Sequence, residues 1–323
     1  MLLAMSGSRS RIIVCCDGSN VRSGRRERCI AREGLRIGGV EHSESFFRGV
    51  YGTRINYSVW KPDRDPVGIL VISHGLGEHA ERYAHVAEEF TRLGLVVYAP
   101  DHRGHGRSGG RRLGLRTWRD YTADLHTMFA IARRHHTGVP AVLLGHSMGG
   151  TIALTYALDH PEGLSAVILS APAIQLATGT PKLIVALGKT LGRYLPFVPV
   201  EKISADDVSR DPVVVEQYKN DPLVHHSFVP AGLARHLVLT MEALPLRLSR
   251  LRVPLLVLHG SEDKLTAVAG SRSVPDLISE TDCTLHVYSG LYHELFNEPE
   301  KKQVLDDVIE WLEPRLSKAQ TPS

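Results

Sequence analysis

The feature that most constrains the fold of this chain is a glycine-rich hexapeptide at residues 145–150. Its sequence, Gly-His-Ser-Met-Gly-Gly, follows an apolar run at 139–144 and precedes a helix-like stretch at 151–159. A Gly-X-Ser-X-Gly pattern between a strand and a helix is typical of a nucleophile elbow, a sharp turn that holds its serine in a strained conformation. Glycines flank the serine because bulk would clash there. The pattern therefore predicts that Ser147 raises its hydroxyl above the end of a sheet.

Around the hexapeptide, strand-like and helix-like segments alternate along the chain. We expect strands at 46–51, 54–60, 67–73, 95–99, 139–144, 166–170, 254–259 and 284–288, and helices at 81–93, 118–134, 148–159 and 301–316. The first two strands read as an antiparallel start. The alternation that follows predicts a mainly parallel sheet with helices on both faces. Together with the elbow it predicts an α/β fold of the α/β-hydrolase type.

The same alternation divides the chain into three parts. Residues 1–44 carry many Arg, Gly and Ser residues without lasting periodicity, and we expect a disordered N-terminal extension. Residues 45–171 and 251–323 carry the α/β pattern and form the expected core. Residues 172–250 interrupt that pattern, so we expect an inserted cap over the active site.

Within the expected cap, an amphipathic helix is predicted near 182–195. Its apolar stripe and its basic face are formed by Leu183, Ile184, Leu187, Leu191, Tyr194 and Leu195 and by Lys182, Lys189 and Arg193. One interpretation is a lid that contacts a lipid or membrane surface. The other is a helix that packs its leucines on the core, which Gly188 and Gly192 favour because glycines weaken a free-standing helix. Both interpretations hold if the helix shifts between a position packed on the core and a position in contact with lipid.

A serine hydroxyl becomes a nucleophile when a base lies within hydrogen-bond reach, and in this fold the acid and then the histidine follow the serine. Glu262 and Asp263 come directly after the expected strand at 254–259. Asp263 has the better spacing, and Glu262 is the alternative. His293 lies in the loop after the last expected strand. We therefore expect Ser147 as nucleophile, His293 as base and Asp263 as the acid that orients the imidazole.

Two backbone N–H groups are expected to stabilise the negative charge that develops on the attacked carbonyl oxygen. Met148 follows the nucleophile, so its amide is the first donor. The expected strand at 67–73 continues into His74 and Gly75, a pair that is frequent in the oxyanion loops of this fold. The amide of Leu76 is therefore the expected second donor.

Other signals exclude several classes of function. Residues 101–108 combine Asp, His, Arg and Gly, but they lack the spacing of a metal site or a phosphate loop, and we interpret them as a structural turn. No cofactor and no metal are expected. The small net charge of +3 argues against nucleic acid as a partner. With no recognisable signal peptide or membrane-spanning run, we expect a cytoplasmic or peripherally membrane-associated or envelope-associated protein.

Five separated motifs resemble those of monoacylglycerol lipases, above all the bacterial members. The motifs are residues 74–79 with Arg82 and Tyr83, residues 101–106, residues 145–150, residues 209–212 with 218–223, and residues 292–298. The resemblance runs from about residue 45 to residue 316. It implies that the chain hydrolyses a monoacylglycerol, a small lipid substrate, to glycerol and a free fatty acid.

The resemblance also implies a polar pocket end for the glycerol, lined or supported by Glu78, Arg82, His146 and Tyr218. Buried glycerol hydroxyls need hydrogen-bond partners, and the acyl chain would lie in an apolar tunnel under the cap. A lysophospholipase, a broad carboxylesterase or an acyltransferase would carry the same triad. A non-catalytic binding protein of the same fold is the alternative from another class, although such proteins usually lack a triad residue.

Overall fold

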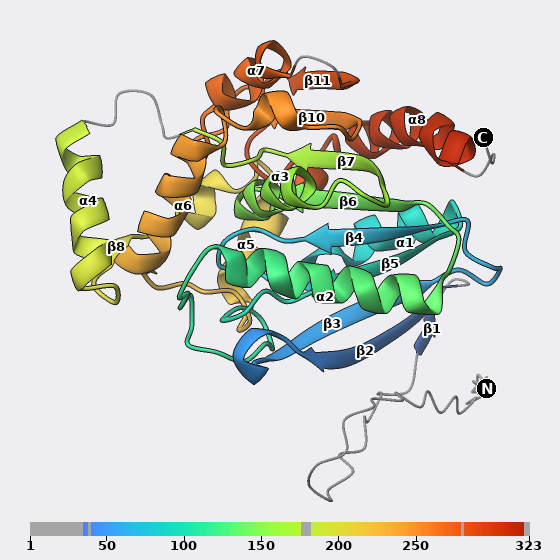
Figure 1. The fold of residues 1–323 in the computed structure, drawn as a ribbon, viewed down its shortest axis with the longest axis horizontal. Coiled ribbons are helices and arrows are strands. Elements are labelled where there is room, and N and C mark those ends of the chain that lie inside the picture. The colour runs from blue at the N-terminus through green and yellow to red at the C-terminus, as the bar shows by residue number, and fades with distance from the viewer. Residues whose placement is uncertain (1–34, 38–39, 176–181, 279–280, 320–323) are drawn as a thin grey trace, which may run out of the picture.

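The computed structural model describes residues 35–37, 40–175, 182–278 and 281–319 (Figure 1). Within these ranges, nine strands form one sheet in the order β1-β2-β3-β5-β4-β6-β7-β10-β11. The strands are β1 (Leu35–Ile37), β2 (Val40–Arg48), β3 (Arg54–Lys61), β4 (Gly68–Ser73), β5 (Leu95–Pro100), β6 (Ala141–His146), β7 (Leu164–Ser170), β10 (Leu255–Gly260) and β11 (Cys283–Tyr288). Pairing is antiparallel from β1 to β5 and parallel from there to β11. The mainly parallel sheet expected from the sequence is confirmed.

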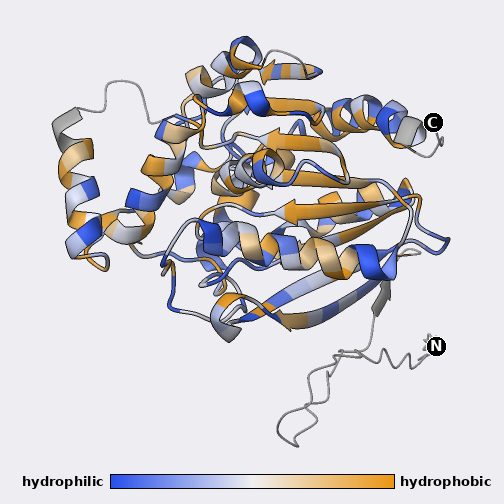
Figure 2. Ribbon diagram, in the orientation of Figure 1, coloured by the Kyte–Doolittle hydropathy of each residue, from blue (hydrophilic) through white to orange (hydrophobic). Residues whose placement is uncertain are grey.

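Helices cover both faces of the sheet. They are α1 (Ala84–Arg92), α2 (Arg119–His135), α3 (Met148–Asp159), α7 (Val268–Leu277) and α8 (Lys301–Ala319). Ile69 and Val71 of β4 pack in the layer of α2 and α3, whereas Leu70 and Ile72 pack in the layer of α1 and α8. Because both faces are covered, the central strands are continuous apolar runs, which appear orange in Figure 2.

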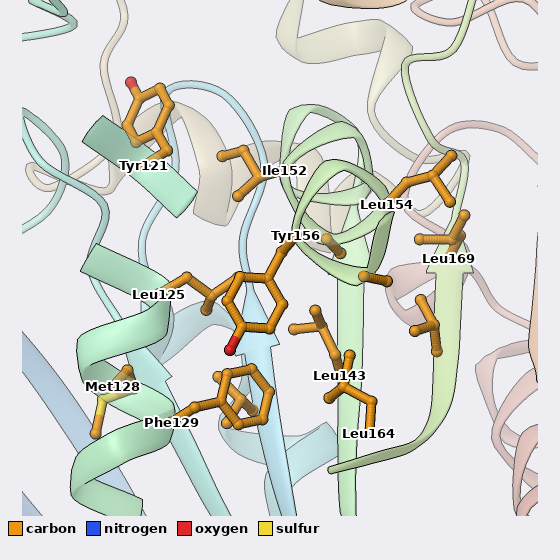
Figure 3. Packing of buried hydrophobic residues seen from close by; sticks show 14 of the residues in the cluster. Tyr121, Leu125, Met128, Phe129, Leu143, Ile152, Leu154, Tyr156, Leu164 and Leu169 are labelled. Carbon is orange, nitrogen blue, oxygen red and sulfur yellow. The ribbon is translucent and has the colours of Figure 1, made fainter. Parts of the chain in front are cut away.

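The contact between α2 and α3 fixes the helix that carries the elbow. Phe129 of α2 stacks on Tyr156 of α3 with ring centroids 5.2 Å apart, and Leu143 of β6 lies beside them (Figure 3). Every side chain of α3 from Met148 to Leu158 is buried. The N-terminal end of α3 is therefore held by packing along the whole helix.

The expected N-terminal boundary at residue 45 is wrong, because strand structure begins earlier. β1 starts at Leu35, and β2 runs from Val40 and pairs with β3 along its length. The side chains of residues 41–46 are only half-buried, so charged and polar residues are compatible with this strand near the sheet edge. Hydropathy alone does not detect such a strand. The predicted disorder of residues 1–34 and 38–39 lies outside the described residues.

Between β7 and β10 the chain forms a separate group of elements, which we call the cap segment (residues 182–250). It contains α4 (Lys182–Tyr194), β8 (Pro199–Glu201), α5 (Pro212–Asn220), β9 (Val229–Pro230) and α6 (Ala231–Ala243). In Figure 1 the arrowheads of β4, β6 and β7 point toward these elements. The cap segment thus lies at the carboxyl edge of the parallel strands, where α/β folds bind ligands.

The helix predicted near 182–195 is present as α4, but two leucines of the predicted stripe are exposed. Leu187 is 61% exposed and Leu195 56% exposed. Gly192 lies on the side that packs, since a Cβ there would lie 2.3 Å from the carbonyl oxygen of Ala231 in α6. Lys189 also faces α6 and pairs with Glu242 at 2.8 Å. Packing on the core therefore does not hold for Leu187 and Leu195, whereas Leu191 is half-buried and the side chains of Leu183 and Ile184 lie outside the described residues. Among the described helices, none is both long and apolar enough to cross a bilayer.

Candidate active site

Ser147 lies in the turn between β6 and α3 with φ 53° and ψ −121°. A positive φ is unusual for a residue that carries a side chain, so packing around the turn must hold it. A Cβ on Gly149 would lie 2.0 Å from the carbonyl oxygen of Ser73, and one on Gly145 would lie 2.4 Å from that of Gly149. Only glycine fits at either position. The predicted elbow is therefore present, and the reason for both glycines is contact with backbone.

The loops after β10 and β11 bring a carboxylate and an imidazole together. His293 Nδ1 lies 2.7 Å from Asp263 Oδ2, and the two side chains are 5% and 0% exposed. Glu262, the alternative acid, points to solvent. The geometry therefore favours Asp263 over Glu262 as the partner of His293.

Asp263 is held by more donors than His293 alone. Its Oδ2 also accepts from Thr266 Oγ1 at 2.8 Å and lies 3.1 Å from His259 Nε2. Its Oδ1 accepts the backbone N–H groups of Leu265 and Thr266. Burial alone raises the pKa of this carboxyl, but the charge of His293 and these hydrogen bonds outweigh burial and hold the pKa well below its usual range. The acid is therefore ionised and fixed in orientation.

The imidazole of His293 is shifted in the opposite direction. Burial alone lowers its pKa, yet the charge and the hydrogen bond of Asp263 outweigh burial and raise the pKa above the ordinary value of 6.5. A base with such a pKa accepts a proton readily near neutral pH. The pair is therefore suited to take a proton from a hydroxyl and to return it.

Ser147 and His293 lie in the same buried region. Ser147 is 8% and His293 4% exposed, and the ring of His146, which precedes the serine, lies 4.7 Å from the ring of His293. Within the described chain, Ser147 Oγ makes no hydrogen bond to the imidazole. Such bonds are often long until a substrate is bound.

The loop after β4 lies against the nucleophile. A Cβ on Gly75 would lie 3.2 Å from the Cβ of Ser147, so the backbone of this loop lines the site. As far as the structure describes the chain, neither Leu76 N–H nor Met148 N–H donates to a protein acceptor. Both amides are therefore free to bind an oxyanion.

Two of the residues expected in the pocket, Glu78 and Arg82, form a buried ionic cluster with Glu294. Arg82 Nη1 donates to Glu78 at 2.7 Å, and its two terminal nitrogens bind Glu294 at 2.6 and 2.7 Å. Glu78 also accepts the hydroxyl of Tyr83 at 2.7 Å and the N–H of Gly75. Burial alone raises the pKa of Glu78, but the charge of Arg82 outweighs it and lowers that pKa. The cluster therefore connects the loop after β4 to the residue next to His293.

His146 and Tyr218 complete this polar end. The ring of Tyr218 lies 4.8 Å from the guanidinium carbon of Arg82. His146 Nδ1 donates to the carbonyl oxygen of Ser170 at 3.1 Å, which leaves Nε2 as an acceptor. Burial lowers the pKa of His146 to about 4, so the ring is neutral. A cavity of about 10 Å³ beside Tyr83, His146 and Glu294 has room for about one water molecule.

Sequence reasoning missed His259, Thr266 and Glu294. His259, the last residue but one of β10, donates through Nε2 toward Asp263, while its Nδ1 lies 2.7 Å from Ser271 Oγ. The sequence signal that could have identified His259 is its position, because it is a polar residue at the carboxyl end of an apolar strand, as His146 is. Glu294 was visible only as the neighbour of His293.

The polar side chains of residues 101–108 make hydrogen bonds that hold the backbone of this segment and of the neighbouring loop. Asp101 accepts the backbone N–H groups of Ala80 at 2.8 Å and Arg107 at 2.7 Å, and its own carbonyl oxygen accepts the hydroxyl of Ser108. These bonds occupy both carboxylate oxygens. They support the interpretation of this segment as a turn that braces the loop after β4.

Known proteins resemble this chain over most of its length. Residues 64–300 match the family described as serine aminopeptidase S33. A monoacylglycerol lipase of Mycolicibacterium smegmatis is 51% identical over 85% of this chain and 98% of that protein. A monoglyceride lipase of Rattus norvegicus is 34% identical over 80% of this chain and 87% of that protein.

Solved structures agree with the sequence comparison. The crystal structure of a Paleococcus ferrophilus monoacylglycerol lipase matches with a TM-score of 0.71 and 32% identity, over 78% of this chain and 96% of that one. The family match at residues 64–300 includes the elbow, the loop after β4 and the loops that carry Asp263 and His293. The chain therefore belongs to the monoacylglycerol lipase family of α/β-hydrolases, within the serine aminopeptidase S33 group.

Proposed function

We propose that this protein is a serine hydrolase that cleaves a monoacylglycerol to glycerol and a free fatty acid. The observation that carries the proposal is the buried pair of Asp263 and His293 beside the strained Ser147. Family membership supplies the substrate class, since the relatives are lipases for monoacylglycerol. The chemistry and the substrate thus have separate support.

In the proposed first step, the Ser147 oxygen attacks the ester carbonyl while His293 takes the hydroxyl proton. The amides of Leu76 and Met148 donate to the oxyanion that forms. His293 then delivers its proton to the departing glycerol oxygen, and the acyl group remains on Ser147. In the second step, water attacks the acyl-enzyme, gives its proton to His293 and releases the fatty acid as the proton returns to Ser147. Asp263 keeps the imidazole in one tautomer throughout.

The polar end beside His293 fits a neutral headgroup better than a phosphate. Two carboxylates, Glu78 and Glu294, surround the single guanidinium of Arg82, so an added phosphate would meet an excess of negative charge. His146 Nε2 and the Tyr218 hydroxyl have no protein hydrogen-bond partner among the described residues and are suited to the glycerol hydroxyls. Glu78 and Arg82 are occupied by each other and by Gly75, Tyr83 and Glu294, so we assign them a supporting role.

The cap segment is proposed to contact the lipid surface from which the substrate comes. Leu187 and Tyr194 on α4 are 61% and 71% exposed, and Leu195, directly after the helix, is 56% exposed. Apolar side chains of this kind on one side of a helix insert into the headgroup region of lipid layers. Contact at α4 would place the carboxyl edge of the sheet toward the lipid. A peripheral location at a membrane or the cell envelope follows from this proposal.

A substrate panel tests the proposed function. Purified protein is assayed on 1-monoolein, diolein and oleoyl lysophosphatidylcholine, with Ser147→Ala as the control for background hydrolysis. We expect the highest kcat/KM on monoolein and release of glycerol and oleate in equal amounts. A higher kcat/KM on diolein or on the lysophospholipid would contradict the substrate. Fatty-acid transfer to added glycerol would indicate an acyltransferase.

Labelling separates the enzyme from a non-catalytic binding protein. A fluorophosphonate probe is expected to modify Ser147 in the wild type and to leave Ser147→Ala unmodified. If the wild type binds monoolein but forms no adduct, the protein is a binder with the fold of a hydrolase.

Tyr218→Phe, which removes one hydroxyl, is expected to raise KM for monoolein and to leave p-nitrophenyl butyrate hydrolysis unchanged.

A further inference from the structure

The side chain of His74 is buried behind the oxyanion loop and makes two hydrogen bonds that fix its tautomer. It is fully buried, at 0% exposure. The backbone N–H of His102 donates to His74 Nε2 at 2.9 Å, so Nε2 carries no proton. The remaining proton of the neutral ring is therefore on Nδ1, which lies 2.8 Å from the carbonyl oxygen of Gly75. His74 thus donates to Gly75.

That carbonyl belongs to the same peptide group as the expected oxyanion donor. The Gly75–Leu76 peptide bond is trans, and the C=O and N–H of a trans peptide point in opposite directions from one rigid plane. A hydrogen bond to the Gly75 carbonyl therefore sets the direction of Leu76 N–H. This N–H points away from His74, and the structure describes no protein acceptor for it.

Glu78 holds the other side of the same glycine. Its Oε1 accepts the N–H of Gly75, so both peptide groups that flank Gly75 are fixed by buried side chains. Residue 75 must be a glycine, because a Cβ there would lie 2.7 Å from Glu78 Oε1. A glycine without restraint samples many backbone conformations, so these two hydrogen bonds are needed to fix its backbone.

We infer that His74 is a positioning residue of the catalytic machinery, one that acts through the Gly75–Leu76 peptide and aims Leu76 N–H at the developing oxyanion. The inference rests on the proposed function, because it takes Leu76 as an oxyanion donor. An oxyanion donor is effective only when its direction is set before the reaction. Burial also lowers the pKa of His74 to about 3, so the ring keeps a single proton over the working pH range.

Two substitutions separate the two hydrogen bonds. In His74→Asn the side-chain amide reaches the position of Nδ1 and retains a donor to Gly75, but nothing accepts the N–H of His102. In His74→Gln the amide oxygen reaches the position of Nε2 and retains that acceptor, but the donor to Gly75 is lost. The first variant keeps the catalytic bond, and the second keeps the bond to the neighbouring loop.

We expect His74→Gln to lower kcat on monoolein by about 10- to 100-fold with KM unchanged, below the roughly 10²- to 10³-fold loss from removing an oxyanion donor. His74→Asn should stay within about threefold of wild-type kcat and show the larger decrease in Tm. A purely structural role would make kcat and Tm fall together. If kcat follows Tm, or if His74→Gln keeps wild-type kcat, the inference is wrong.

A spectroscopic measurement on the unmodified protein tests the same tautomer if a variant fails to fold. In ¹⁵N-histidine-labelled wild type, the His74 ring should show a protonated Nδ1 and an unprotonated Nε2 that do not titrate between about pH 5 and 9, since its pKa is far below that range. A protonated Nε2 would overturn the inference.

Parallel assays on p-nitrophenyl butyrate keep the test independent of the lipid substrate. If wild type hydrolyses this ester but not monoolein, the proposed substrate fails while His74 is still tested.

Discussion

Two helices that both carry large apolar side chains, α3 and α4, have opposite environments in this protein. In α3, which starts at the nucleophile, every side chain from Met148 to Leu158 is buried. In α4, Leu187 and Tyr194 are 61% and 71% exposed, and the packed residue is Gly192. The apolar side chains of α3 hold the turn that carries Ser147, whereas those of α4 leave an exposed apolar surface that we propose contacts lipid.

The two helices also differ in the polar groups around them. The turn before α3 is surrounded by buried, fully bonded polar side chains such as Glu78, Arg82 and Asp263. Beside α4 the described ion pair, Lys189 with Glu242, is partly exposed and contributes little to stability. Substitutions near α3 should therefore act on the rate of the chemical step, and those on α4 should act on access to lipid.

The largest expected effect is on the acid of the triad. Asp263→Asn should lower kcat by roughly 10⁴-fold, because an asparagine favours the wrong imidazole tautomer. Glu262→Gln, one residue away and exposed, is the matched control and should keep wild-type kcat on p-nitrophenyl butyrate. Wild-type activity in Asp263→Asn would move the acid assignment to Glu262.

Two glycine substitutions test the packing contrast directly. Gly149→Ala forces a methyl group to within 2.0 Å of the Ser73 carbonyl oxygen and should destabilise the protein by more than about 3 kcal/mol. Gly188→Ala meets nothing within 4 Å and should stabilise it by roughly 0.5–1 kcal/mol. Urea unfolding of both variants measures the two free energies. A large loss of stability in Gly188→Ala would mean that α4 is more tightly packed than its exposure indicates.

Removal of the exposed leucines tests the lipid-contact proposal. Leu187→Ser with Leu195→Ser should raise the apparent KM on monoolein vesicles by roughly tenfold, because an interface buries part of the about 1.5–3 kcal/mol available per leucine. The same variant should hydrolyse dissolved p-nitrophenyl butyrate at the wild-type rate. Unchanged binding to vesicles in a sedimentation assay would contradict the role of α4.

The mildest test changes only pH. Because Asp263 raises the pKa of His293 above 6.5, the base is protonated and inactive at low pH, and kcat/KM should rise with pH through a midpoint above 6.5. In Asp263→Asn the charge is lost and burial remains, so the midpoint of the residual activity should move downward. A wild-type midpoint below 6 would show that burial, rather than Asp263, determines the pKa of His293.

Local sequence determined much of this protein. Gly145, Ser147 and Gly149 identify the elbow because only that turn needs two glycines around a strained serine. The continuous apolar runs identify the parallel strands because both faces of the sheet are covered. The pairing of Asp263 with His293 was predictable from chain order, since the fold places the loops after its last strands at one edge.

Only the tertiary structure decided what depends on contacts between distant segments. The half-buried polar strand β2 is held by pairing with β3, which leaves no apolar pattern to read. The side of α4 that packs is decided by the close approach of Gly192 to Ala231, and hydropathy predicts the opposite side. The bonds of His74, His259 and Glu294 join residues far apart in the chain, and a side chain carries no local signal of a partner that folding alone supplies.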